Sequence, residues 1–173
     1  MTQTLPIRGL HPSLPFLSAM REIVVSQIAT VSIWATFLPM PDHAHEHHQM
    51  RIAVKQLRYS LDMADAVLSD DVRAIIKDLK SVQESLGELH DLDVLFLSVE
   101  QSLFALDQSK VSGKRHEARQ ARLAAKKASM EALLSSVADA RDHTHQQCVA
   151  LWKDAQARDV FAPLNHWVQE NVD

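Results

Sequence analysis

Residues 71–106 read DVRAIIKDLKSVQESLGELHDLDVLFLSVEQSLFAL, with one glycine and no proline. They lie inside a longer segment, from Asp42 to Ala162, that has no proline and is rich in Ala, Leu, Gln, Lys, Asp and Glu. These residue types favour helix, whereas proline and glycine interrupt it. The sequence therefore predicts a long helix over 71–106 and an all-α fold around it.

The flanking sequence predicts further helices on both sides of this one. They are expected over 13–37, 45–68, 114–157 and, as a short closing helix, 160–172. Ser69 precedes the central helix as a turn and cap, and Gly113 marks the turn after it. Because short connections make long amphipathic helices antiparallel neighbours, the predicted architecture is an up-down-up-down four-helix bundle. Residues 1–12 form a tail, and residues 13–173 form one domain.

The composition excludes several other protein classes. Aromatic residues make up 5% of the 173 residues and glycine occurs 3 times, which is too few for a β-sandwich or barrel. The single cysteine, Cys148, cannot form an internal disulfide. The most apolar window, from Ile23 to Met40, is interrupted by polar residues, so it is interpreted as a buried helix rather than a membrane span. We expect a cytoplasmic protein without membrane contact.

The charges are unevenly distributed along a chain whose formal net charge is -4. Residues 51–60 carry three basic and no acidic residues, and residues 108–127 carry seven basic residues and one acidic residue. Such blocks in an acidic chain indicate either a negatively charged partner or an ordinary solvated helix face.

Helical spacing places each basic block on one side of its helix. Arg51, Lys55 and Arg58 lie beside the apolar stripe of the helix over 45–68. The second stripe belongs to the helix over 114–157 and comprises Arg115, Arg119, Arg122 and Lys126. Since these two helices run in the same direction in the predicted bundle, their basic halves are expected to meet. Seven crowded cations repel one another, so a multivalent anion is predicted between them.

Two motifs resemble those of a known family. The run from His48 to Tyr59, HQMRIAVKQLRY, is similar to the signature H-x-x-R-[VI]-x-x-[KR]-[KR]-L-R of the CHAD domain, the conserved histidine α-helical domain. The downstream residues LGELHDLDVL, 86–95, resemble the family's second stretch, L-G-x-x-[RH]-D-x-D-V-L. The ending, with Leu151-Trp152, Phe161 and Leu164, is also similar. The chain is thus identified as a CHAD member from its first helix onward.

The resemblance implies an all-helical domain that binds inorganic polyphosphate in a basic groove and is not itself an enzyme. Carried over by position, His48, Arg51, Lys55 and Arg58 would contact the anion, with Lys80 in support. The stripe of Arg115, Arg119, Arg122 and Lys126 rests on spacing alone. Neither a cofactor nor a metal ion is implied.

The chain also departs from the family pattern. Gln56 stands where a second adjacent cation is usual, and the chain is acidic overall. Family members usually carry two tandem copies of the bundle that face each other, and this chain has one. A second identical chain would supply the missing half most simply, so we expect a homodimer with the groove at or beside its interface.

Other functions remain open at this point. The basic seam could meet an acidic protein partner, which would make the chain a helical interaction domain. His43, His45, His47 and His48, with Glu46, could instead form a transition-metal site, the third alternative. His143 and His145 are expected on the surface. Nucleic acid is disfavoured because the basic blocks lack interleaved aromatic residues, and no catalytic residues are predicted.

Overall fold

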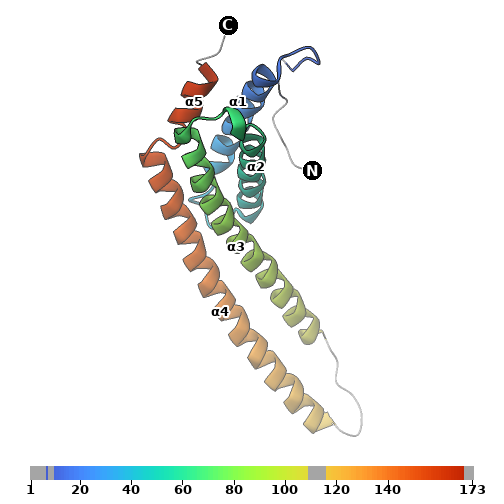
Figure 1. The fold of residues 1–173 in the computed structure, drawn as a ribbon. Helices are drawn as coiled ribbons and strands as arrows, with labels where there is room; N and C mark the ends of the chain where they lie inside the picture. Colours follow the sequence, from blue (N-terminus) through green and yellow to red (C-terminus); the bar gives the residue numbers. More distant parts are fainter. Residues whose placement is uncertain (1–6, 8–9, 109–115, 170–173) are drawn as a thin grey trace.

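The computed structural model describes residues 7, 10–108 and 116–169 (Figure 1). Helix α1 spans Phe16–Ala35, α2 spans Ala44–Met63, α3 spans Asp70–Asp107, α4 spans His116–Ala157 and α5 spans Ala162–Gln169. A single 3-10 turn, η1, covers Asp65–Val67. The described residues contain no strand, so the all-α prediction is confirmed.

Helix α3 begins where the sequence places its cap. Ser69 has an extended backbone, and its side chain accepts a hydrogen bond from the amide of Val72 at 3.5 Å. Asp70 and Asp71 occupy the first turn, where negative charge favours the helix N-terminus. The predicted span 71–106 thus agrees with the observed Asp70–Asp107 to within one residue at each end.

Contacts between successive helices show antiparallel packing. In each pair of helices, residue numbers rise along one helix as they fall along the other. The pairs are Gln27–Ser60 and Phe37–His47 for α1 and α2, Arg58–Gln83 and His48–His90 for α2 and α3, and Arg158–Asp78 and Arg141–Asp93 for α3 and α4, where Phe37 and Arg158 lie just after the ends of α1 and α4. Helices α2 and α4 therefore run in the same direction.

The helices differ in length by a factor of two. Helices α1 and α2 have 20 residues each, whereas α3 has 38 and α4 has 42. At 1.5 Å per residue, these lengths are about 30 Å and about 60 Å. The far half of the α3–α4 hairpin therefore extends beyond α1 and α2, as Figure 1 shows. Only the near half belongs to a multi-helix body.

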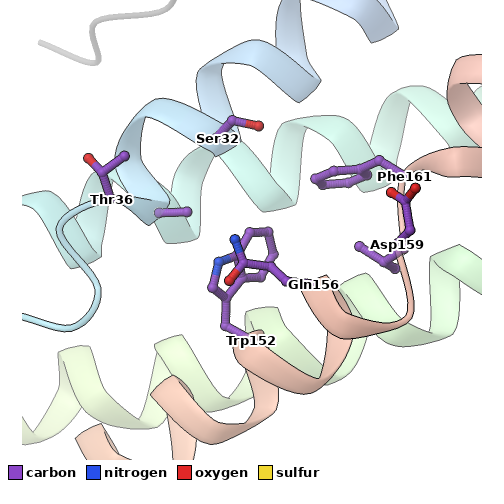
Figure 2. A pocket seen from close by; sticks show the side chains of 8 residues that line it. Ser32, Thr36, Trp152, Gln156, Asp159 and Phe161 are labelled. Atoms are coloured by element: carbon purple, nitrogen blue, oxygen red, sulfur yellow. The ribbon is translucent and has the colours of Figure 1, made fainter.

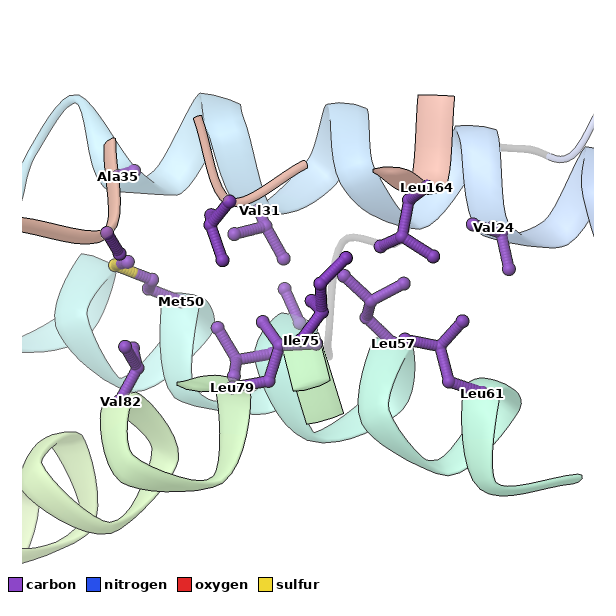
Figure 3. Close-up of a cluster of buried hydrophobic side chains, with 14 of the residues drawn as sticks. Val24, Val31, Ala35, Met50, Leu57, Leu61, Ile75, Leu79, Val82 and Leu164 are labelled. Atoms are coloured by element: carbon purple, nitrogen blue, oxygen red, sulfur yellow. The ribbon is translucent and has the colours of Figure 1, made fainter. Parts of the chain in front are cut away.

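The hydrophobic core lies in that near half. Figure 3 shows side chains of α1, α2, α3 and α5 meeting in one cluster. Fully buried members include Val24, Val31, Leu57, Leu79 and Leu164. Helix α5 contacts both α1 and α3. The short closing helix therefore completes the core rather than hanging free.

Helix α1 is the most apolar element. Among the described residues it is the one helix with the length and composition to cross a membrane, with a mean hydropathy of 1.3. Core helices of soluble proteins meet the same criterion. Val24 and Val31 are completely buried against the core, whereas Val25 and Ile33 are about half exposed. One face of α1 is thus packed inside the protein, and the opposite face is open.

Candidate anion-binding site

The cations of α2 lie along its seam with α3. The ring of His48 is 4.2 Å from that of His90, measured between ring centroids. Arg58 Nε donates a hydrogen bond to Gln83 Oε1 at 3.1 Å. One row beside α3 therefore begins at His48 and continues, at helical spacing, with Arg51, Lys55 and Arg58. We call this row and its α3 neighbours the α2–α3 seam.

Arg51 of α2 lies beside Gly87 of α3, which has no side chain. It is half-buried, and a Cβ atom added at Gly87 would lie 3.5 Å from Arg51 Nε. This nitrogen is buried and has no hydrogen-bond partner among the described residues. A buried donor without an acceptor is costly, and a bound anion would satisfy it. Gly87 thus allows the Arg51 side chain to lie close to the α3 backbone.

Lys55 and Arg58 continue the row toward the C-terminal end of α2. Their charged groups lie 5.5 and 4.8 Å from the centre of the Tyr59 ring. Such cation–π contacts hold long side chains in place without neutralising them. Lys55 is exposed to solvent, so its ammonium group is available to a ligand. The row therefore presents the exposed Lys55 beside the partly buried Arg51 and Arg58.

Lys80 lies on the α3 side of the seam. Together with Gln83, Gly87 and His90 it follows the three- and four-residue spacing of one helix face. Its ammonium nitrogen is 3.8 Å from Glu84 Oε1, and both side chains are 61% exposed. An exposed pair of this kind is weak, so it leaves Lys80 available to a stronger anion.

Few carboxylates neutralise the row of α2. The residues of α3 in contact with it, Gln83, Gly87 and His90, are uncharged or titratable. Arg58 has Asp62 at 4.0 Å, on its own helix. Within the described part of the chain, neither Arg51 nor Lys55 forms an ion pair. The seam therefore keeps an excess of positive charge.

The basic stripe of α4 lies far from this seam, and the prediction that the two meet is wrong. His145 of α4 packs beside His47 near the start of α2, with ring centroids 5.3 Å apart. The stripe residues Arg119, Arg122 and Lys126 precede His145 along α4 by about 30 to 40 Å at 1.5 Å per residue. Arg51 follows His47 along α2, in the direction that leads away from the stripe. The distance between Arg51 and the stripe is therefore greater still.

The error has a simple physical origin. Parallel helices bring their N-terminal halves together only when they start at the same level. Helix α4 starts at the far end of the long hairpin, whereas α2 starts halfway along it. The three cations are exposed on the projecting part of α4. Arg115, the fourth member of the predicted stripe, lies outside the described residues.

The histidines before and within α2 point in different directions. His43 pairs with Glu46 at 3.3 Å, His45 is exposed, and His48 lies in the seam. His47 is buried, and its Nε2 donates to the carbonyl of Phe37 at 3.3 Å. No group of three potential metal ligands was found in the described residues. The predicted cluster is thus divided around the helix.

His145 is buried, which corrects the expectation that it lies on the surface. Its Nε2 donates to the carbonyl of Leu38 at 2.8 Å, beside His47. The sequence did contain a signal, because His145, Cys148 and Trp152 follow the spacing of one buried helix face. The two histidines thereby satisfy backbone carbonyls at the end of α1.

The pKa values of two histidines are lowered. Burial lowers the pKa of His47 most strongly, and the nearby His145 and Arg141 lower it further, against the opposing effects of Phe37 and Asp93. Burial also lowers the pKa of His48, with smaller contributions from His90, Arg51 and His45. His48 therefore enters the seam more readily as a neutral hydrogen-bonding group than as a cation at neutral pH.

A buried ion pair anchors the body to the long hairpin. Arg141 Nε donates to Asp93 Oδ1 at 2.5 Å, and Arg141 Nη2 donates to the carbonyl of Pro41 at 2.6 Å. One guanidinium group thus joins α3, α4 and the connection between α1 and α2. Spacing alone identifies neither partner, because they are remote in sequence.

Comparison with known families gave a match over the first three helices. The model of the CHAD domain family matches residues 20–97. Over this stretch, which is a little under half of the chain, the sequence is similar to the CHAD domain family. No curated protein and no solved structure gave a match to the chain.

The matched CHAD segment contains every residue of the seam. It spans nearly all of α1, the whole of α2, and α3 as far as Leu97. His48, Arg51, Lys55, Arg58 and Lys80 fall inside it, whereas Arg119, Arg122 and Lys126 fall outside. The family relationship and the geometry therefore both distinguish the seam from the basic stripe of α4.

Proposed function

We propose that the protein binds inorganic polyphosphate, without chemical conversion, along the α2–α3 seam. The observation that carries the proposal is the row of Arg51, Lys55 and Arg58 beside α3 residues, Gln83, Gly87 and His90, that carry no carboxylate. The CHAD family is associated with polyphosphate or triphosphate binding. Arginine suits phosphate oxygens through paired hydrogen bonds, and lysine adds a point charge.

Two observations favour binding without a catalytic step. Burial raises the pKa of the Cys148 thiol, which disfavours a nucleophilic thiolate. Asp91 is exposed, whereas Asp93 is buried against Arg141, so the two carboxylates do not share an environment. We accordingly propose a binding role, in the cytoplasm, for the described domain.

The test is a calorimetric titration with long-chain polyphosphate at low salt. The seam variant carries Arg51→Ala, Lys55→Ala and Arg58→Ala. Its matched control carries Arg119→Ala, Arg122→Ala and Lys126→Ala, which removes the same charge from the projecting hairpin. We expect the seam variant to lose at least tenfold in affinity and the hairpin variant to lose less than threefold. Equal losses would contradict the seam, and no binding by the wild type would favour an acidic protein partner.

We propose further that the protein forms a homodimer. Leu97 and Phe104 are 53% and 67% exposed and lie seven residues apart, on one face of α3. Leu97 lines a hollow with Ala44 at the start of α2, and Phe104 lies about two turns further along α3 toward the hairpin tip. Large exposed apolar side chains at helical spacing are typical of association surfaces. Light scattering after gel filtration should give twice the monomer mass, and Leu97→Ser with Phe104→Ser should give the monomer.

A further inference from the structure

A cavity lies between α1 and α4, outside the α2–α3 seam. Its volume is about 310 Å³, which is within the range of small-molecule sites. In Figure 2, Trp152 and Gln156 of α4 extend toward α1, and Asp159 and Phe161 close the same space from the turn before α5. Ser32 and Thr36 lie on the α1 side. The bundle is thus open along this edge.

The innermost polar group of the cavity lacks a partner. Trp152 is 5% exposed, and its indole Nε1 is buried with no hydrogen-bond partner among the described residues. This is the only polar atom of the side chain, and it can only donate. Most buried donors in proteins are paired, so an unpaired one calls for an acceptor that enters the cavity.

The α1 side of the cavity offers acceptors rather than donors. The hydroxyl of Ser32 donates to the carbonyl of Ile28 at 2.9 Å, and that of Thr36 donates to the carbonyl of Ile33 at 2.7 Å. Both protons are therefore used within α1, so these oxygens have only lone pairs left to offer. A ligand at this wall must supply donors.

The turn before α5 adds negative charge and an aromatic surface. Asp159 lines the cavity with a carboxylate, and the rings of Phe161 and Trp152 lie 6.1 Å apart, tilted by 60°. Hydrogen bonds fix the turn, because the Asp159 amide donates to the Gln156 carbonyl at 3.0 Å and the Ala162 amide donates to the Asp159 carbonyl at 2.8 Å. A carboxylate beside aromatic rings is suited to an organic cation.

We propose that this cavity binds a small organic ammonium compound that also carries a hydroxyl or carbonyl oxygen. The oxygen accepts the hydrogen bond of Trp152. The ammonium group donates to the carboxylate of Asp159 and lies against the ring of Phe161. The unpaired indole donor and the carboxylate of the lining then each have a partner of opposite character.

The test uses the three indole N–H resonances of the protein, one from each tryptophan, in a proton–nitrogen correlation spectrum. Trp152→Phe identifies the resonance of Trp152. The probe is 3-amino-1-propanol, protonated at neutral pH, and its matched controls are 1,3-propanediol and 3-hydroxypropanoate. We expect the probe to shift the Trp152 resonance saturably, with millimolar affinity for so small a molecule, and to leave Trp34 and Trp167 unchanged.

Two variants test the role of the carboxylate. Asp159 has a backbone φ of 48°, which asparagine also adopts readily, so Asp159→Asn removes the charge and keeps the turn. Glu100→Gln makes the same change of charge at an exposed site away from the cavity. We expect at least tenfold weaker binding for Asp159→Asn and unchanged binding for Glu100→Gln. The proposal is overturned if the diol shifts Trp152 equally, if Asp159→Asn binds normally, or if no probe moves the resonance.

Discussion

The contact between Arg51 and Gly87 decides how deeply a cation can lie in the α2–α3 seam. The absent side chain of Gly87 leaves the guanidinium group beside the α3 backbone, where its Nε is withdrawn from water. A cation placed in this way interacts more strongly with an anion than a fully hydrated one. A glycine within a helix lowers stability relative to alanine, so a small side chain at this position should be tolerated and a large one should not.

Substitution of Gly87 separates these two effects. Gly87→Ala places a Cβ at an ordinary contact distance of 3.5 Å from Arg51, so we expect unchanged polyphosphate affinity and a gain of about 0.5 to 1 kcal/mol in unfolding free energy. Gly87→Leu must displace the guanidinium group, so we expect at least a tenfold loss of affinity. Calorimetry and urea denaturation measure the two quantities. Equal affinities for the two variants would contradict the role of this contact.

The buried His47 makes the stability depend on pH. Because folding lowers its pKa, the unfolded chain binds more protons in the window below the ordinary value of about 6.5. The free energy of unfolding should therefore fall as the pH drops from 7 through that value toward the lower pKa of the folded state. His145, Arg141 and Asp93 are the titratable or charged groups acting on this ring.

Replacement of the ring should reduce this dependence. We expect His47→Gln to show a shallower loss of stability between pH 7 and pH 5 than the wild type, as measured by urea denaturation at each pH. His45→Gln, at an exposed position of the same helix, should follow the wild-type curve. Parallel curves for His47→Gln and the wild type would assign the acid sensitivity to other groups.

At the scale of the helices, two ion pairs link α3 to α4 in contrasting surroundings. Asp93 and Arg141 are 8% and 17% exposed, in the body of the protein. Asp107 and Lys127, 2.7 Å apart, are 51% and 42% exposed near the tip of the hairpin. Buried partners cannot exchange each other for water, whereas exposed partners can.

Double-mutant cycles with alanine should distinguish the pairs. For Asp93→Ala and Arg141→Ala we expect single losses of about 3 kcal/mol or more and a coupling free energy above about 1.5 kcal/mol. For Asp107→Ala and Lys127→Ala the coupling free energy should stay below about 1 kcal/mol. Urea denaturation provides both values. A larger coupling at the exposed pair would contradict the anchoring role of Arg141.

The sequence predicts where each helix begins and ends far better than it predicts how the helices are offset from one another along the bundle axis. Pro15, Ser69 and the glycine and proline content fix where helices begin and end, because these residues act locally. The seam on α2 was predictable because its residues lie on one helix and match a family motif. The position of Arg122 was not, because it depends on how far α3 extends past α2. Likewise, His145 has neighbours that only the packing of α1 and α4 defines.

At the scale of the whole molecule, the structure separates two basic regions that the sequence alone seemed to join. One lies in the body, along the α2–α3 seam within the CHAD segment, and the other lies on the projecting hairpin. A net charge of -4 does not oppose this arrangement, because binding responds to local charge within a screening length of about 10 Å.

The salt dependence of polyphosphate binding tests the central claim most directly. Each phosphate neutralised by a cation releases counterions, so the slope of log affinity against log salt counts the cations engaged, at about 0.7 per contact for a single-stranded polyanion. We predict that removal of Arg51, Lys55 and Arg58 reduces the slope by about two. The removal of Arg119, Arg122 and Lys126 should leave it unchanged. An unchanged slope in the seam variant, or a reduced one in the hairpin variant, would contradict the assignment of polyphosphate to the seam.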